Sequence, residues 1–227
     1  MAKKKKSDDS VNSVVNELEK NMFSLKFYPV AVDEKTKDEA VKEIKRRYST
    51  GNETVKQLVL YMLHESIAEF FEFRIVHTFD YMKTKNPNLE PARMRMEIYK
   101  KMFNYNTSIE GIISIVGVVS ELEGDDSAKL LTYHYARLCT WESEASIVMR
   151  NAIIDALGKC DSLYGFNALL EYAKNTDNEK TYNRLVRALE NWDEKLSKMK
   201  ISDVKKKKYT EKLRNILTKE FRGRHYG

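Results

Sequence analysis

The sequence predicts an all-α protein, and three observations support this fold class. The chain has 227 residues but only 8 glycines and 3 prolines, whereas all-β folds need many turns that use these residues. Lysine, glutamate, leucine, alanine and methionine, which favour helix, are plentiful. Apolar residues recur at spacings of three and four along most of the chain, as expected for helices with a buried face. Hydrophobic residues make up 42% of the chain, which is enough to form a sizeable core.

The first part of the chain divides into a tail and a helical region. Residues 1–10, a lysine run followed by Ser and Asp, are predicted to be a disordered basic tail because they have nothing to bury. Residues 11–106 form the predicted N-terminal helical part. Within it, Asp33 is expected to cap a helix that extends through Tyr48. A long apolar pattern from Glu53 to about Tyr81 predicts a central helix that is buried on more than one side.

Shorter and more regular helices are predicted from residue 107 onward. The apolar spacing places them at 107–123, 126–140, 143–160, 162–174, 178–198 and 206–221. Breaks such as "EGDD", "TWES" and "NTDN" separate them. Because these links are short, consecutive helices are expected to be antiparallel neighbours.

Two of these helical segments resemble each other. The stretch "RNAIIDALGKC" (150–160) matches "YNRLVRALENW" (182–192) at an offset of 32 residues. The matched positions include an asparagine (Asn151 and Asn183), an alanine–leucine pair and two aliphatic residues between them. Matching turns accompany the matching helices, which favours a true repeat. The positions expected to be buried, which include the paired leucines of the intervening helix, are Ala156, Leu157, Leu169, Leu170, Ala188 and Leu189.

The stretch "RNAIIDALGKCDSLYGFNALLEYAKNTDNEKTYNRLVRAL" resembles HEAT repeats in their degenerate form. An Ala-Leu-Gly ends one helix, an Asp-containing turn follows, and a Leu-Leu pair packs the next helix. The resemblance is clearest over residues 147–192 and covers 107–198. It implies a HEAT-like α-solenoid of antiparallel helix pairs with a longer-helix N-terminal part, whose curved face binds a macromolecular partner. The alternative is an ordinary helical bundle, because any two amphipathic helices share apolar spacings.

The sequence carries no local motif of a catalytic or cofactor site. Gly-rich phosphate loops, Gly-x-Ser-x-Gly and Cys-x-x-Cys are absent. In "HESIAEFFE" (64–72), a zinc-protease motif would need a histidine where Ala68 stands, so we interpret this stretch as a solvated acidic stripe. His134 is expected to be a packed or half-exposed core histidine rather than a ligand, and Cys139 and Cys160 to be reduced core residues that bind no metal. We therefore predict no catalytic residue, no metal and no cofactor, and we do not expect an enzyme.

Charge is distributed unevenly along the chain. The net charge is +6, with +4 at residues 3–6 and +8 at residues 198–227, which leaves −6 for residues 7–197. An acidic body with basic ends suggests that polyanions contact the ends. The alternative is a basic surface that only keeps the protein in solution. The candidate nucleic-acid contacts are Lys3, Lys4, Lys5, Lys6, Lys205, Lys206, Lys207, Lys208, Arg214, Arg222 and Arg224.

The end of the chain and its aromatic residues supply two further expectations. Residues 199–227 are predicted to be a basic C-terminal helix and tail, with Leu213, Ile216, Leu217 and Phe221 docked on the preceding helices. Large aromatic residues with a polar group are favoured at interfaces, although core filling explains them equally well. The candidate partner face consists of Tyr133, Tyr135, Trp141, Tyr164 and Tyr172.

Two functions from different classes follow from these observations. The first is a non-catalytic interaction scaffold that holds a protein partner on its curved face and contacts nucleic acid through basic ends. The alternative is a nucleic-acid enzyme, similar in length and architecture to DNA glycosylases with alkylation-type HEAT-like repeats, although none of their catalytic residues carries over. A basic groove over residues 107–198 would favour the enzyme or a direct duplex binder, and an acidic or neutral groove would favour the scaffold.

With neither a signal peptide nor an apolar stretch of membrane-spanning length, a cytoplasmic location without membrane insertion is expected.

Overall fold

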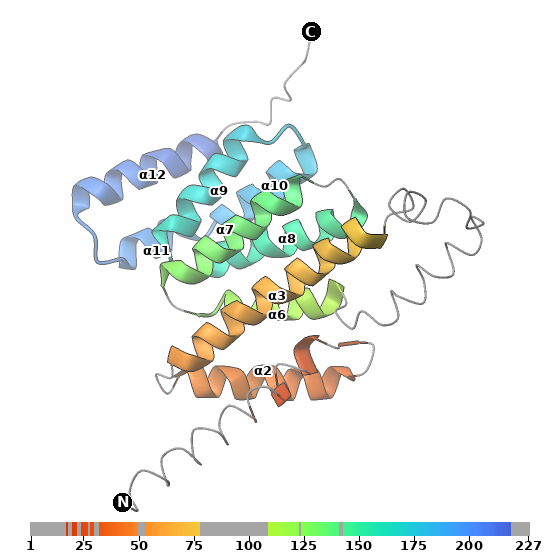
Figure 1. Ribbon diagram of the computed structural model, residues 1–227. Coiled ribbons are helices and arrows are strands. Elements are labelled where there is room, and N and C mark those ends of the chain that lie inside the picture. The colour runs from red at the N-terminus through yellow and green to blue at the C-terminus, as the bar shows by residue number, and fades with distance from the viewer. Residues whose placement is uncertain are drawn as a thin grey trace, which may run out of the picture. The chain divides into compact units, whose positions relative to one another are not determined.

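The computed structural model describes residues 17, 20–21, 24–26, 28–29, 32–49, 53–77, 109–122, 124–140 and 143–218, and of Thr54 and residues 69–77 it describes the backbone only. Every regular element in these ranges is a helix (Figure 1), which confirms the all-α prediction. The chain divides into two compact units, Met1–Val118 and Val119–Gly227.

The first unit contains α2 (Glu34–Ser49), α3 (Glu53–His77) and most of α6 (Ile109–Val119), and α2 packs against α3. The predicted cap of α2 is confirmed, because the backbone N–H of Thr36 donates to Asp33 Oδ1 at 2.7 Å. This bond lowers the pKa of Asp33. The start of α3 at Glu53 is also as predicted.

The buried face of α3 is narrower than the sequence predicted. Its fully buried aliphatic residues recur at every fourth position, at Val55, Val59, Leu63 and Ile67. Tyr61, which lies on another side of the helix, is 62% exposed. Over the part of α3 whose side chains are described, the helix therefore has one buried stripe rather than burial on several sides.

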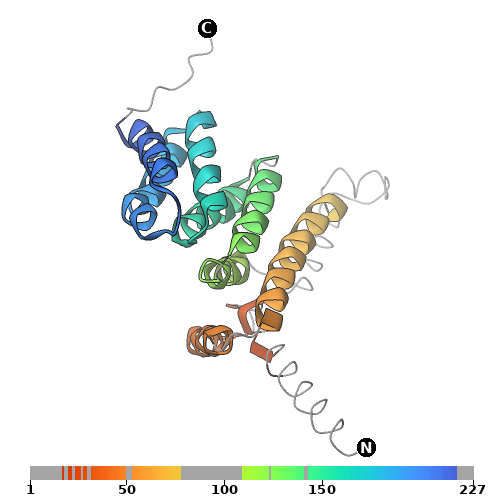
Figure 2. The same ribbon diagram turned by 90° about the vertical axis from the view of Figure 1, so that its left-hand side faces the viewer.

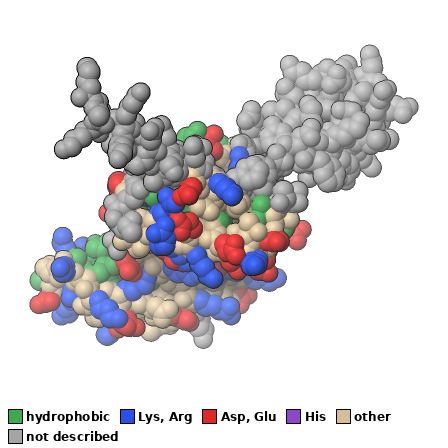
Figure 3. Space-filling model, turned by 90° about the horizontal axis from the view of Figure 1, so that it is seen from below, with side chains coloured by type: hydrophobic (Ala, Val, Ile, Leu, Met, Phe, Trp, Pro, Cys, Tyr) green, Lys and Arg blue, Asp and Glu red, His purple; other side chains and the backbone are tan. Residues whose placement is uncertain are grey.

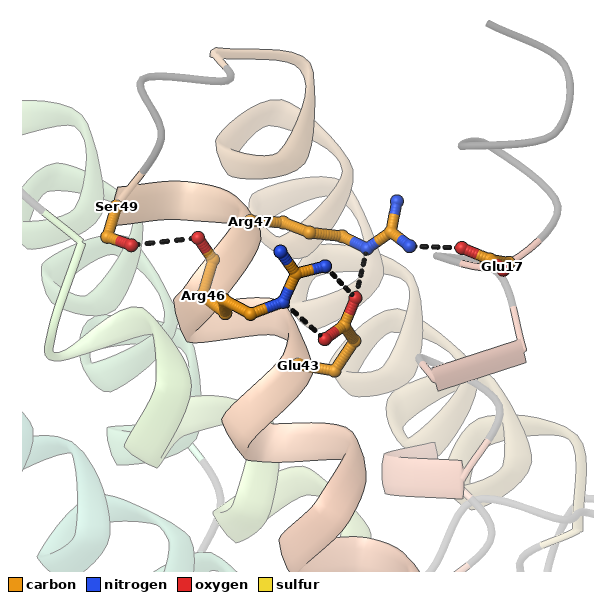
Figure 4. A network of polar contacts seen from close by, with 5 residues as sticks. All are labelled: Glu17, Glu43, Arg46, Arg47 and Ser49. Carbon is orange, nitrogen blue, oxygen red and sulfur yellow. Dashed lines mark hydrogen bonds and ion pairs between the residues drawn. The ribbon is translucent and has the colours of Figure 1, made fainter. Parts of the chain in front are cut away.

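A carboxylate and two guanidinium groups link the turns of α2 (Figure 4). Glu43 accepts hydrogen bonds from Nε and Nη2 of Arg46, both at 2.7 Å, and from Nε of Arg47 at 2.7 Å. Arg47 also pairs with Glu17. The bonds from Arg46, and then those from Arg47, lower the pKa of Glu43 to about 2.

Because the folded-state pKa of Glu43 lies below its ordinary value of 4.5, its ion pairs stabilise the protein above that value. Their contribution is lost as the pH falls from about 4.5 toward about 2. We expect Glu43→Gln to lower the Tm by about 2 °C at pH 6, as for other exposed ion pairs. The difference from the unsubstituted protein should shrink steadily between pH 4.5 and pH 2.5. Calorimetry across this range checks the prediction, and a difference that is constant with pH would contradict it.

The second unit contains six described helices. These are α7 (Asp125–Cys139), α8 (Glu144–Lys159), α9 (Leu163–Asn175), α10 (Glu179–Leu189), α11 (Trp192–Lys198) and α12 (Asp203–Leu217). Short links join α7 to α8 and α9 to α10, and within each pair the two helices pack against each other. In addition, α7 packs beside α9, α8 beside α10, and α9 beside α12. Each helix of the first pair therefore lies alongside the corresponding helix of the second pair (Figures 1 and 2).

Local side-chain caps fix where three of these helices begin. The side chains of Ser143, Ser162 and Asn178 each accept a hydrogen bond from the backbone N–H three residues later, at 3.1, 3.3 and 3.0 Å. Ser162 Oγ also donates to Asp125 Oδ1 at 2.5 Å, which ties the start of α9 to the first turn of α7. The predicted starts at 143, 162 and 178 therefore coincide with the capping residues.

The core of the second unit contains five of the six positions predicted from the repeat. The residues that are at most 3% exposed are Ala156, Leu157, Leu169, Leu170 and Leu189. Ala188 is only half-buried, so this part of the prediction is wrong. It lies against Gly158, where an added Cβ would be 2.9 Å from Ala188 O and 3.0 Å from Ala188 Cβ. The close approach of α8 and α10 thus depends on glycine at 158.

We expect Gly158→Ala to destabilise the second unit by about 1–3 kcal/mol, because the new methyl group would overlap the backbone of α10. Gly117→Ala is the matched control, since a Cβ at Gly117 would have no atom of the described residues within 4 Å. There, alanine should stabilise the helix by about 0.5–1 kcal/mol. Urea unfolding of both variants checks the prediction, and a stabilised Gly158→Ala variant would contradict it.

The helix predicted at 178–198 is two helices, which corrects the sequence analysis. A turn at Glu190–Asn191 separates α10 from α11. The turn brings Trp192 into the core, where it is 0% exposed and its ring lies 4.7 Å from that of Phe166. Burial of this large side chain outweighs the local preference for a continuous helix.

The redirected α11 also caps the C-terminal end of α8. Lys195 Nζ donates to the carbonyl oxygens of Gly158 at 3.0 Å, of Lys159 at 2.7 Å and of Cys160 at 3.4 Å. It also pairs with Asp161 Oδ1 at 2.9 Å. A cation at this position satisfies carbonyl groups that have no partner within the helix.

The C-terminal helix α12 docks by fewer residues than predicted. Leu213 and Ile216 are 1% and 5% exposed, whereas Leu217 is 37% exposed, and Phe221 lies outside the described residues. Tyr182 Oη donates to Ile216 O at 3.0 Å and joins α10 to the end of α12.

Two surface properties complete the description. Among the helices in the described ranges, none has both the length and the apolar composition needed to cross a membrane. On the face seen in Figure 3, Lys and Arg side chains lie among Asp and Glu side chains rather than in a separate basic patch.

Candidate functional site

A groove with a volume of about 1240 Å³ crosses α7, α8, α9 and α10 of the second unit. The C-terminal parts of α7 and α9, the N-terminal half of α8, the loop between α9 and α10, and most of α10 line it. The groove therefore spans both helix pairs. It lies at the edge of the unit that carries the link from α7 to α8 and the link from α9 to α10. This volume exceeds the 300–1,000 Å³ that is typical of small-molecule pockets.

Two stacked tyrosines form part of the groove wall. The rings of Tyr135 and Tyr172 lie 4.1 Å apart with an interplanar angle of 24°. Burial raises the pKa of both phenols, that of Tyr172 to about 12. Tyr172 Oη donates to Thr132 O at 3.4 Å. Because the rings stack on each other, the contact holds α7 and α9 together in addition to lining the groove.

The charged groups of the groove are mainly cationic. Arg150 of α8 and Lys180, Arg184 and Arg187 of α10 line it, and among the described lining residues Asp177 is the single carboxylate. The groove is therefore basic although the body of the chain is acidic. The whole-chain charge pattern did not reveal this local reversal.

Some of these cations already have partners. Arg184 forms a two-bond ion pair with Asp155 of α8, in which Nε donates to Oδ1 at 2.9 Å. Arg150 Nη1 donates to Cys139 Sγ at 3.7 Å. Among the described carboxylates, none forms an ion pair with Arg150, Lys180 or Arg187. As far as the described residues are concerned, Lys180 and Arg187 thus remain available to a ligand, and Arg150 has no carboxylate partner but already contacts Cys139.

Side-chain amides accompany the cations. Asn151, Asn175, Asn178 and Asn183 line the groove, together with the hydroxyl groups of Thr176 and Thr181. Asn178 Oδ1 is used in the α10 cap. Each amide offers two donors and one acceptor group, so the groove presents hydrogen-bonding groups of both kinds beside its positive charge.

The predicted partner face is divided between two places. Tyr135 and Tyr172 line the groove, and Tyr135 is only 6% exposed. Tyr133 and Tyr164 are 50% and 44% exposed on α7 and α9 but do not line the groove. Trp141 lies outside the described residues.

The predicted nucleic-acid contacts are described only on α12. Lys205, Lys207, Lys208 and Arg214 are exposed there, whereas Lys206 is half-buried and donates to Ser197 O at 2.8 Å. The remaining candidates lie outside the described residues and are Lys3, Lys4, Lys5, Lys6, Arg222 and Arg224.

The two cysteines are unbridged, as predicted, but they are not both core residues. Cys160 is 2% exposed, and burial raises the pKa of its thiol to about 11. Cys139 is exposed and lines the groove, which corrects the sequence analysis. It lies at the last turn of α7, where the helix reaches the surface. His134 is fully buried, which is the first of the two environments expected for it.

Sequence reasoning missed the groove cations, although one signal pointed to the groove. Asn151 and Asn183 are equivalent in the repeat, and both line the groove. Core packing does not require asparagine, so a polar residue that recurs at the same repeat position marks a surface feature of both helix pairs. Arg150 and Arg187 carry no such signal, because their repeat equivalents are not basic.

Among the described residues, no group of three or more His, Cys, Asp or Glu side chains is placed to hold a metal ion. Comparison with known proteins finds no matching family model, no similar curated protein and no similar solved structure.

Proposed function

We propose that the protein is a non-catalytic helical-repeat scaffold that binds a protein partner in the basic groove of its second unit. The proposal includes a HEAT-like stack of helix pairs in this unit, as the sequence resemblance implies. Its support is the packing of α7 beside α9 and of α8 beside α10, in addition to the packing within each pair. Neighbouring pairs in such a stack form a continuous surface on which a partner lies across several helices.

The groove itself is the observation that carries the proposal. It crosses two helix pairs, is larger than most small-molecule pockets, and combines cationic, amide and aromatic side chains. By the criterion of the sequence analysis, a basic groove favours the enzyme or a direct duplex binder over the scaffold. The support for a protein partner is therefore the set of amide and aromatic side chains that line the groove beside its cations. Charge complementarity with an anionic partner steers the encounter and selects the partner.

The glycosylase alternative has weaker support. An enzyme that acts on a base needs an accessible aromatic face or a pocket for the extruded base. The enzymes of this resemblance use a Trp and an Asp at the damaged base. Here Trp192 is 0% exposed against Phe166 and Asp155 is paired with Arg184, while Trp141 lies outside the described residues. The basic groove is the one observation that favours this alternative, and a base-excision assay on alkylated duplex DNA tests it.

Affinity capture with two forms of the protein tests the scaffold function. The unsubstituted chain and an Arg150→Glu/Arg187→Glu variant serve as baits, with and without nuclease treatment. We expect proteins that resist nuclease to be retained by the first bait and lost from the second. Identical sets on both baits would remove the groove from the proposal, and loss of all partners on nuclease treatment would replace a protein partner by nucleic acid.

Nucleic-acid contact through the basic ends is a separate part of the proposal. Its support is the exposed basic surface of α12, formed by Lys205, Lys207, Lys208 and Arg214. We expect replacement of residues 3–6 and 205–208 by glutamine to abolish nucleic-acid binding while leaving the Tm nearly unchanged. The binding should be independent of sequence and should weaken steeply between about 50 and 200 mM salt, because it rests on counterion release. Filter binding with a mixed-sequence duplex measures it, and affinity that survives the substitutions would place the site in the body of the protein.

A further inference from the structure

We infer that the ligand of the basic groove is an acidic polypeptide segment bound in an extended conformation. The inference rests on the proposed function and names the chemical class of the partner segment. Three features of the groove carry it, namely the amide side chains, the row of cations on α10, and the carboxylates that lie among the cations.

The amide side chains match a polypeptide backbone. Asn151, Asn175 and Asn183 offer both donors and acceptors to the groove. A peptide backbone likewise carries one N–H donor and one C=O acceptor at each residue other than proline. A phosphodiester backbone carries acceptors only, so it would leave the acceptor half of each amide unused. Asn151 and Asn183 come from neighbouring helices, α8 and α10, which places two such amides along the path of one bound segment.

One interval in the row of cations on α10 matches the spacing of alternate residues in an extended chain. Lys180, Arg184 and Arg187 follow one face of the helix at intervals of four and three residues. With a rise of 1.5 Å per residue, Lys180 and Arg184 are about 6 Å apart along the axis, and the whole row is about 10 Å long. Alternate side chains of an extended peptide point to the same side and are about 6.6 Å apart. The interval from Arg184 to Arg187 is shorter, about 4.5 Å, and Arg184 is already held by Asp155. In a peptide with an acidic residue at every second position, no point along the chain is more than about 3.3 Å from such a residue, so the long side chains of Lys180 and Arg187 can each reach one.

The carboxylates in and beside the groove disfavour a nucleic acid. Asp177 lines the groove, and Asp155 holds Arg184 in an ion pair. A nucleic-acid strand carries one negative charge at every phosphate and would pass close to both carboxylates. A peptide with spaced acidic residues avoids this repulsion. In addition, Tyr135 and Tyr172 stack on each other, so the two facing rings do not offer those faces to bases.

Cys139 provides a direct readout of occupancy. It is exposed and lines the groove, 3.7 Å from Arg150 Nη1. The other thiol, Cys160, is 2% exposed with a raised pKa, so it reacts slowly with alkylating reagents near neutral pH. Alkylation of Cys139 by iodoacetamide, followed by mass spectrometry, therefore reports whether the groove is filled.

The experiment compares three labelled probes on the full-length chain. The first is a peptide of about twelve residues with alternating Thr and Glu, since alternate residues of an extended chain share a side. The second has Gln in place of Glu, and the third is oligothymidylate with the same number of charges. We expect the Glu peptide to slow alkylation of Cys139 and to bind at least about tenfold more tightly than either of the others, as measured by fluorescence anisotropy.

Matched variants assign the binding to the groove. Arg150→Gln/Arg187→Gln is expected to weaken the Glu peptide at least about tenfold. Lys205→Gln/Lys208→Gln, which removes the same charge from α12, is expected to leave the peptide affinity unchanged. Asn151→Ala/Asn183→Ala is expected to weaken the peptide without affecting oligothymidylate. If Arg150→Gln/Arg187→Gln unfolds, Arg150→Lys/Arg187→Lys keeps the charge but loses the paired donor geometry, and it should give an intermediate affinity.

Two results would overturn the inference. Oligothymidylate that protects Cys139 and binds at least as tightly as the Glu peptide would make the groove a nucleic-acid site. A Glu peptide that leaves alkylation of Cys139 unchanged would remove acidic segments as the ligand. Neither result decides the scaffold function, which stands or falls separately on whether nuclease-resistant partners depend on Arg150 and Arg187.

Discussion

Leu157→Asp is expected to unfold the second unit. Leu157 is 0% exposed in the core between the helix pairs. An unpaired carboxylate at this position would cost several kcal/mol, to which the lost burial of leucine adds. The total is comparable to the 5–15 kcal/mol by which a typical domain is stable. Hydrogen exchange measures the effect, and the amides of α7 to α12 should lose their protection.

Val148→Asp is the matched control, since it makes the same type of change in the same helix at a side chain that is 40% exposed. It should leave exchange in α7 to α12 almost unchanged. Protection of the second unit that persists in the Leu157→Asp variant would contradict the assigned core.

Trp192→Ala is expected to destabilise the second unit by about 3–5 kcal/mol, as for other fully buried aromatic residues. The indole ring lies 4.7 Å from the ring of Phe166, which in turn meets the ring of Tyr209 edge-on at 5.7 Å. Removal of the indole would therefore open a cavity where α9, α11 and α12 meet. Urea unfolding followed by circular dichroism measures the loss.

Two variants make the Trp192 result specific. Trp192→Phe keeps an aromatic ring and should recover part of the stability, while Glu190→Ala changes an exposed residue in the adjacent turn and should have little effect. Equal losses from Trp192→Phe and Trp192→Ala would show that ring packing is not the source of the stability.

The sequence predicted the helices of the second unit well because local features define them. Ser143, Ser162 and Asn178 are good capping residues, and each makes the expected bond. The apolar spacing located most of the core, including Leu157 and Leu189, without knowledge of tertiary contacts.

The break between α10 and α11 could not be predicted in the same way. The stretch "LENWDEK" contains neither glycine nor proline, and its residues are compatible with a continuous helix. The turn exists because Trp192 is buried against Phe166, which lies 26 positions earlier in the chain. Such a contact is a property of the assembled fold.

The groove shows a similar limit. Its asparagines are visible in the repeat, but its charge depends on which faces of α8 and α10 meet. Arg150 and Arg187 are separated by 37 positions in the sequence and line one groove only because these two helices lie side by side. The sum of charges along the sequence places both residues in an acidic body. That sum does not show that the groove itself is positively charged.

The end of α8 can be capped only after Lys195 has been synthesised, because Lys195 binds the last carbonyl groups of that helix. Lys195 follows Lys159, whose carbonyl oxygen it binds, by 36 residues. At 5–20 residues per second, the ribosome needs roughly 2–7 s to add them. Throughout that interval the last turn of α8 has water as the partner of its carbonyl groups, and Phe166 lacks the indole that covers it. A chain that ends before residue 192 therefore lacks both the Lys195 bonds to the end of α8 and the indole that packs on Phe166.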